Sequence, residues 1–214
     1  HQMPPVSDVV RDVIELLRTN VDSEDVNCAY RGALTKVLKL SSLSQKQRDA
    51  LDLATPVTEW AVKDELIRSL TEKYSQVLGV RVHGKTADYL LWDGMNVPGT
   101  YGNPDKPPGV EHLCIGILML EGVADSAVTS NWDGLIERAV SELCANPDRM
   151  LRVVVDAEEF RLPEARSTLI KFHGCAIRAV RDENKYRPLL VAREKQISGW
   201  SVQPQNQYMA SKLQ

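Results

Sequence analysis

Short apolar runs alternate with amphipathic stretches in the second half of the chain, and this alternation limits the possible folds more than any other feature. The apolar runs have the length of β-strands, and the stretches between them repeat with a helical period. Parallel strands need long crossover connections, which are usually helices. The pattern therefore predicts an α/β fold with a parallel sheet. Strands are predicted at 127–129, 152–155, 167–172 and 187–192, and helices at 112–120 and 135–144.

The first half has a different pattern, with helical periodicity and few strand-like runs. Helices are predicted at 6–18, 29–40, 44–53 and 59–78. Residues 92–110 are rich in glycine and proline, which indicates a long irregular loop. Because this loop precedes the predicted strands, it is a candidate lid over a site at their ends.

Composition excludes several classes of protein. The 214 residues carry a net charge of −3, which argues against direct nucleic-acid binding. The four cysteines are far apart, so the paired spacing of a zinc site is missing and reduced thiols are expected. No apolar stretch approaches the roughly 20 residues that span a bilayer, and no signal peptide is recognised. We therefore expect a cytoplasmic protein without zinc and without a membrane segment.

Two polar segments stand where predicted strands end. The first is Asn131–Gly134, after the strand at 127–129, and the second is Phe172–Gly174, at the end of the strand at 167–172. Ligands of open α/β sheets bind at the carboxyl ends of the strands, so the two segments could line one pocket. Asparagine, aspartate and histidine side chains can hold an amide-bearing ligand and move a proton.

Each segment also has a purely structural interpretation. Asn-x-Asp-Gly is a common turn, and a histidine after an apolar strand is often a core residue. His83 and Gly84 repeat the His-Gly pair elsewhere in the chain, so the pair by itself indicates no function. Gly174 would allow a ligand to approach the backbone. Trp132 either packs on the sheet or stacks on a ligand ring.

Taken together, the two segments resemble the sirtuin superfamily, and most closely its zinc-less, bacterial sirtuin-like branch. Residues 127–137, AVTSNWDGLIE, resemble the family pattern T-x-N-x-D-x-L-I-E. Residues 169–175, LIKFHGC, resemble the family's K-[LF]-H-G strand. Residues 189–193, together with Trp200, resemble the next segment of that branch. The resemblance covers about residues 110 to 200.

The resemblance implies a modified Rossmann fold that binds NAD as its substrate. It implies that Asn131 is catalytic and holds the nicotinamide ribose or an attacking water. It implies that His173 is the general base at the ribose hydroxyls. Asp133, with the backbone of Trp132, would recognise the nicotinamide carboxamide, and Gly174 would also belong to the NAD-binding residues.

The sequence departs from the family in three respects. The glycine-rich phosphate turn G-A-G-x-S is absent, a later glycine-serine motif is absent, and Ser130 replaces a commoner threonine or glutamine. We therefore expect residues 1–214 to be a single sirtuin-like domain that lacks both of its ends. Within it, a helical module and irregular loop would span 6–110, and a Rossmann core segment would span 111–200.

The function that the resemblance implies is that of an NAD glycohydrolase, which cleaves NAD to nicotinamide and ADP-ribose. Zinc-less branches resemble effectors of bacterial anti-phage defence, so a homo-oligomer and a partner ATPase or Argonaute-type sensor are expected. One alternative is an NAD-dependent protein deacylase. Another is a non-catalytic module for assembly or nucleotide sensing.

Overall fold

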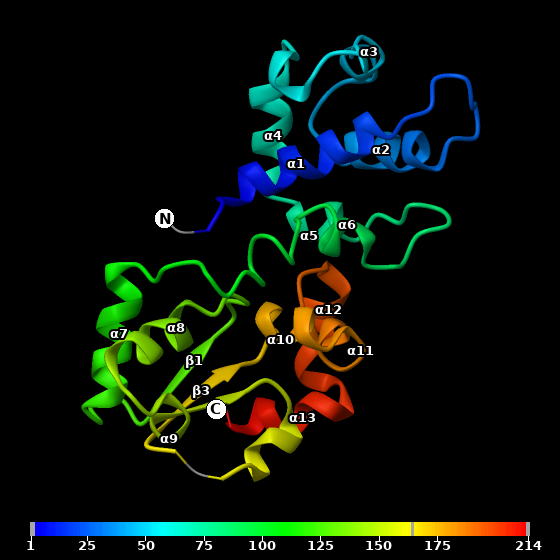
Figure 1. Cartoon of the computed structure of the whole chain (residues 1–214). Coiled ribbons are helices and arrows are strands. Elements are labelled where there is room, and N and C mark those ends of the chain that lie inside the picture. The colour runs from blue at the N-terminus through cyan, green and yellow to red at the C-terminus, as the bar shows by residue number, and fades with distance from the viewer. Residues whose placement is uncertain (1–2, 164, 213–214) are drawn as a thin grey trace. The chain divides into compact units, whose positions relative to one another are not determined.

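The computed structural model describes residues 3–163 and 165–212. The chain divides into two compact units, one of Pro4–Val97 and one of Pro98–Gln214 with His1–Met3. Their boundary falls inside the glycine- and proline-rich stretch at 92–110. Figure 1 shows the elements of both units.

The first unit is helical among its described residues. Its central helix, α1, buries an apolar stripe and packs against α2 and α4. The predicted helices at 6–18 and 29–40 are confirmed, and Ser44 begins the third helix with a capping box. The elements are α1 (Val6–Thr19), α2 (Ala29–Leu40), α3 (Gln45–Asp49), η1 (Val57–Glu59), α4 (Lys63–Thr71), α5 (Tyr74–Val77) and α6 (Tyr89–Trp92).

The long helix predicted at 59–78 is wrong as a continuous element, because the structure divides that stretch into η1, α4 and α5. The first break is at Trp60, whose backbone is extended with φ −69° and ψ 130°. The Trp60 ring is buried, and its Nε1 donates a hydrogen bond to the carbonyl of Asp52 at 2.9 Å. The extended backbone at Trp60 therefore accompanies a buried ring that bonds a residue preceding η1. The helix predicted at 44–53 likewise ends early, at Asp49.

The second unit contains the predicted alternation of strands and helices. Its first part is α7 (Val110–Leu120), β1 (Ser126–Thr129), α8 (Leu135–Leu143), α9 (Pro147–Met150), β2 (Leu151–Val154) and η2 (Ala157–Arg161). Its second part is β3 (Ser167–Lys171), α10 (Ala176–Arg181), α11 (Glu183–Tyr186), η3 (Arg187–Leu189), α12 (Glu194–Gly199), η4 (Trp200–Val202) and α13 (Pro204–Lys212).

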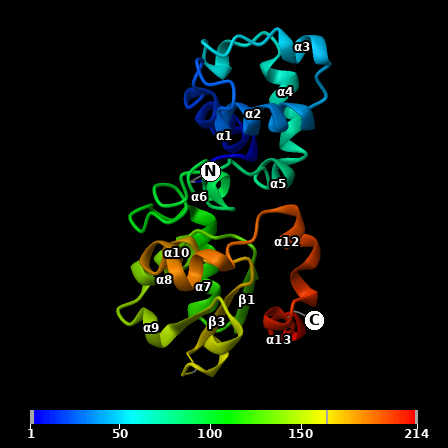
Figure 2. The same cartoon turned by 90° about the vertical axis from the view of Figure 1, so that its right-hand side faces the viewer.

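The three strands form an open parallel sheet in the order β1-β3-β2. One face, which includes Leu169, is covered by α7 and α8. The opposite face, which includes Ile170, packs against Trp200 of η4 and Met209 of α13 (Figures 1 and 2). The predicted α/β class and parallel sheet are thus present, with β3 buried between two layers.

The strand predicted at 187–192 is wrong. Residues 187–189 form the 3-10 turn η3, and the extended residues that follow it join no strand of the sheet. Pro188 lies inside this turn and lacks a backbone N–H, which does not suit a central strand. The next residues run beside the end of β3 instead, where the backbone N–H of Val191 donates to the carbonyl of His173 at 3.0 Å.

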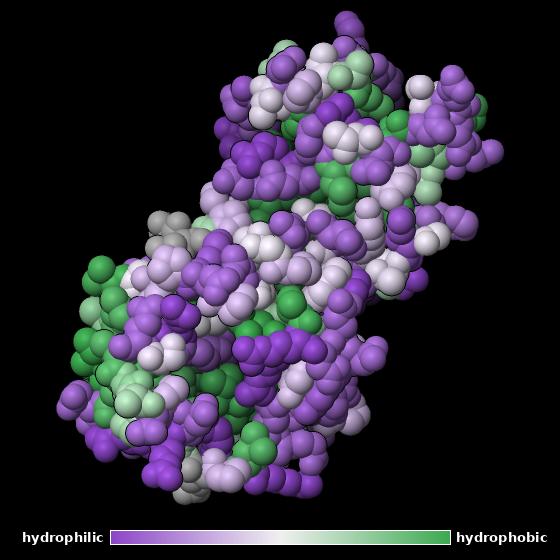
Figure 3. Space-filling model, in the orientation of Figure 1, coloured by the Kyte–Doolittle hydropathy of each residue, from purple (hydrophilic) through white to green (hydrophobic). Residues whose placement is uncertain are grey.

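The outward side of α7 is apolar. Val110, Ile117 and Leu118 are 74%, 47% and 46% exposed, and Cys114 on the same side is also exposed. Figure 3 shows hydrophobic surface over this helix. An apolar face of this kind is typical of a surface that contacts another protein segment.

We expect Gly174→Ala to destabilise the second unit by about 2–5 kcal/mol. Gly174 has a φ of +96°, and an added Cβ would lie 2.7 Å from the carbonyl oxygen of Leu189. Gly84 is the matched control, because its φ is +78° but a Cβ there would meet nothing within 4 Å. Gly84→Ala should cost only the backbone strain, about 1–2 kcal/mol. Urea unfolding measures both, and equal losses would contradict the packing role of Gly174.

Candidate functional site

The two polar segments that the sequence singles out begin at one edge of the sheet. Thr129, the last residue of β1, pairs in register with Lys171, the last residue of β3. A backbone hydrogen bond then joins the segments, from the N–H of Ala176 to the carbonyl of Trp132 at 2.9 Å. The structure therefore brings the turn at 130–134 next to the turn at 172–175, at the carboxyl ends of neighbouring parallel strands.

Trp132 and Asp133 are both buried in the first turn. The Trp132 ring packs edge-on against Tyr101, with 5.7 Å between ring centroids. The Asp133 carboxylate accepts a hydrogen bond from the backbone N–H of Leu135 at 3.1 Å, which helps to begin α8. Burial, together with the charge of Asp133, raises the pKa of Tyr101 to about 12. Tyr101 belongs to the predicted loop, so this loop covers Trp132 directly.

Asn131 is exposed at the same turn. Its backbone N–H donates to the hydroxyl of Thr129 at 3.0 Å, which fixes the turn while the side chain stays on the surface. An exposed carboxamide at the end of β1 is available to hydrogen-bond a ligand or a water molecule.

His173 is half-buried at the end of β3. Its ring lies 4.3 Å from the Phe172 ring and 6.4 Å from the Trp200 ring, centroid to centroid. Burial lowers the pKa of His173 below its usual value, because the charged form loses solvation. The imidazole is therefore neutral at pH 7 and able to accept a proton.

Gly174 has a different environment from the one that the sequence suggests. The close approach at this residue is made by the chain itself, since the backbone of Leu189 and Leu190 occupies the space beside the Cα. The glycine thus lets the segment after η3 lie against the His173 turn.

Lys171 and Glu137 are central to the site but were not singled out from the sequence. The Lys171 ammonium is fully buried and donates to Glu137 Oε1 at 2.8 Å. It also donates to the carbonyl oxygens of Trp132 and Asp133. Burial is the largest single influence and opposes the charge, but Glu137, Cys175 and Asp133 together outweigh it and raise the pKa of Lys171 above its usual value. One ammonium group thereby joins β3, α8 and the turn between β1 and α8.

The signal for this cluster is a lysine inside the otherwise apolar run of residues 167–172. A lysine in a buried strand requires an acidic partner. Glu137, in the first turn of the helix after the neighbouring strand, is such a partner. The sequence does not show which of the chain's acids it would be.

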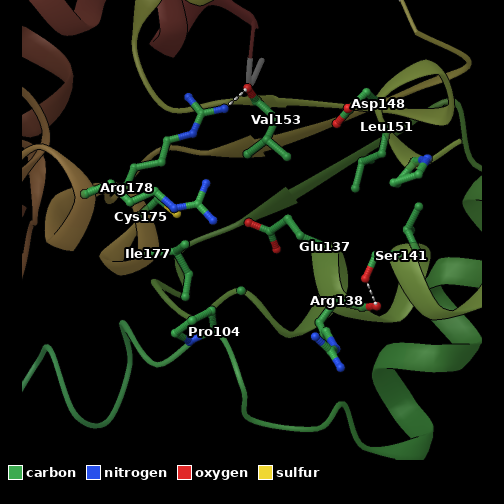
Figure 4. Close-up of a pocket in the computed structure, with 14 residues that line it drawn as sticks. Pro104, Glu137, Arg138, Ser141, Asp148, Leu151, Val153, Cys175, Ile177 and Arg178 are labelled. Carbon is green, nitrogen blue, oxygen red and sulfur yellow. Dashed lines mark hydrogen bonds between the residues drawn. The ribbon is translucent and has the colours of Figure 1, made fainter.

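A cavity of about 380 Å³ lies on the α8 side of the sheet. It lies between α8 and α10 and over β2, and Pro104 of the preceding loop also lines it (Figure 4). Gly134 and Cys175 line the cavity, and each follows a predicted site residue in the chain. Asn131, Trp132, Asp133 and His173 are not among the lining residues, so the cavity adjoins the two turns without containing their polar groups.

Among residues 3–163 and 165–212, no cluster of three or more His, Cys, Asp or Glu side chains is arranged to hold a metal ion. Within the same residues no helix is long and apolar enough to cross a membrane. No family model, curated protein or solved structure matches the chain. Fold and site define an α/β protein with a small parallel sheet and a polar carboxyl edge.

We expect Lys171→Met to lower the free energy of unfolding by about 3–5 kcal/mol. The substitution removes the ammonium and leaves the Glu137 carboxylate and two carbonyl groups without their donor. Arg138→Ala is the control, because the Arg138 side chain forms a surface ion pair with Glu142, with side chains 45% and 40% exposed. That change should cost less than about 1 kcal/mol. Urea denaturation compares them, and a Lys171→Met loss as small as that of Arg138→Ala would contradict the structural role of the cluster.

Proposed function

We propose that the protein is an NAD glycohydrolase, which breaks the bond between nicotinamide and ribose. The observation that carries the proposal is the shared edge of the sheet, where the Asn131 turn and the His173 turn are neighbours. A base and an amide-binding turn at the carboxyl ends of adjacent parallel strands suit a nucleotide ligand. The resemblance to sirtuin-like proteins supports NAD as that nucleotide.

The proposed reaction uses water as the nucleophile. Water attacks C1′ of the nicotinamide ribose, the C–N bond breaks, and the cationic nicotinamide leaves as a neutral molecule. One proton is released from the attacking water. His173, neutral because of its burial, accepts that proton or orders the ribose hydroxyls, and Asn131 holds the ribose or the water. Asp133 accepts from the carboxamide of nicotinamide beside the backbone of Trp132.

His173→Ala should lower the rate of nicotinamide release from NAD by about 10²- to 10⁴-fold, because it removes the base. His83→Ala is the matched control, since His83 also precedes a glycine but is exposed in the helical unit. The measurement is nicotinamide formation by the whole protein, with and without an activating partner. Full activity of His173→Ala, or intact NAD in every condition, would contradict the proposal.

The pH dependence of the rate should follow the lowered pKa of His173. The neutral base persists below the usual histidine pKa, so the acid limb of the rate profile should lie below pH ~6.5. The free energy of unfolding should also decrease toward acid pH. The folded chain disfavours the protonated imidazole. The contribution of the neutral ring to stability is therefore complete above the His173 pKa of the unfolded chain, and it is lost as the pH falls through the lower pKa of the folded chain. An acid limb above pH 7 would contradict this assignment.

A second candidate function is nucleotide binding without turnover. It is favoured by the structural roles of Trp132 and Asp133, since the ring packs on Tyr101 and the carboxylate accepts from the backbone N–H of Leu135 at the start of α8. Calorimetry separates the candidates: heat of NAD binding with no nicotinamide release in any condition favours the sensing module.

The setting that we propose is the cytoplasm of a bacterium, as an oligomeric effector of anti-phage defence. All four cysteines are free thiols, which supports a reducing compartment. The apolar outer face of α7 supports assembly with further copies of the chain. A partner ATPase or Argonaute-type sensor remains part of this proposal through the sirtuin-like resemblance.

A further inference from the structure

The 380 Å³ cavity between α8 and α10 has chemistry of its own. Its floor is apolar and formed by Leu151 and Val153 of β2, whereas its walls combine charged side chains with apolar ones. A volume of this size is at the lower end of the range for small-molecule sites, about 300–1,000 Å³. None of the side chains proposed to cleave NAD lines it. The cavity is therefore a candidate binding site distinct from the proposed NAD site at the sheet edge.

Glu137 provides an acceptor that lacks a donor. Its Oε1 takes the hydrogen bond from Lys171, but Oε2 is buried and has no hydrogen-bond partner among the residues that the structure describes. Figure 4 shows the Glu137 side chain projecting from α8 toward the α10 wall of the cavity. A buried carboxylate oxygen without a donor costs free energy, so a ligand hydroxyl at this position would be stabilising.

Two arginines of α10 provide positive charge on the facing wall. Arg178 is held in place, because its guanidinium donates to Glu159 at 2.5 Å and to the carbonyl of Val153 at 2.9 Å. Arg181 also lines the cavity and forms no hydrogen bond or ion pair within the described part of the chain. A free guanidinium beside a cavity is suited to a phosphate or carboxylate group.

We propose that this cavity binds a small hydroxylated anion of the sugar-phosphate class. A ligand hydroxyl donates to Glu137 Oε2, and the ligand phosphate accepts from the guanidinium of Arg181. The two interactions require a hydroxyl and an anion in one molecule, which distinguishes this ligand from a simple salt ion.

A chain of hydrogen bonds connects the cavity to the turn at 130–134. Glu137 holds the Lys171 ammonium, and Lys171 holds the carbonyl groups of Trp132 and Asp133. A ligand that fixes the Glu137 carboxylate therefore also restrains that turn. By thermodynamic linkage, a ligand of the turn then favours binding in the cavity.

Calorimetric titration with ribose 5-phosphate tests the site, with inorganic phosphate and free ribose as the two halves of the ligand. We expect ribose 5-phosphate to bind at least tenfold more tightly than either half. Arg181→Ala should weaken it at least tenfold. Ser141→Phe should abolish binding, because Ser141 lines the cavity and its hydroxyl donates to the carbonyl of Arg138 rather than to the Glu137–Lys171 pair. Arg161→Ala, a surface arginine paired with Glu158 outside the cavity, should change the affinity less than twofold.

Hydrogen exchange gives a second measurement, since bound ribose 5-phosphate should slow amide exchange in residues 130–135. Three results would overturn the proposal: no binding of ribose 5-phosphate at millimolar concentration, equal affinity in wild type and Ser141→Phe, or equal affinity for phosphate alone. These titrations contain no NAD, so ribose 5-phosphate can bind to the cavity of a protein that does not cleave NAD. Likewise, a protein that cleaves NAD can fail to bind ribose 5-phosphate.

Discussion

The ammonium group of Lys171 is the interaction on which the rest of the site depends. A charged group buried at the end of the central strand is unfavourable unless each of its protons has a partner. Glu137 and the carbonyl groups of Trp132 and Asp133 supply those partners. Burial of the charge therefore favours the packing of β1, β3 and α8 in which the Lys171 ammonium has all of these acceptors.

In that arrangement the polar edge of the sheet has one packed side and one side that is accessible to solvent. On the packed side, the Trp132 ring contacts Tyr101 and the Asp133 carboxylate accepts from the N–H of Leu135 at the start of α8. On the open side, the Asn131 side chain is exposed and the His173 ring is partly accessible. Such a combination suits the NAD-cleaving site that we propose, because the proposed base and amide-binding turn would be held in place.

Much of the second unit could be predicted from the sequence, because its strands and helices have strong local patterns. The apolar run of β3 and the alternation around β1 predict the parallel sheet, whereas the pairing of β1 with β3 is a finding of the structure. The strand prediction at 187–192 was wrong because an apolar run after a proline has the pattern of a strand. In the structure this segment packs its backbone against Gly174. Residues 60–62 interrupt a helical pattern because burial of the Trp60 ring overrides helical periodicity.

The two strand ends that form the candidate site could be predicted from the sequence, but the contacts between its elements could not. Asn131 and His173 mark strand ends, and a strand end is visible in sequence. The partners of Lys171 and the cavity between α8 and α10 depend on distances between elements far apart in the chain, and no local pattern encodes those distances.

The central claim is that the Asn131 turn and the His173 turn form one NAD pocket. NMR titration of the whole protein with NAD tests it most directly, by following the Asn131 side-chain amide and the His173 imidazole in the same experiment. The account predicts that both signals shift along one saturation curve with the same dissociation constant. It would be contradicted if saturating NAD moved neither signal, or if only one of the two responded.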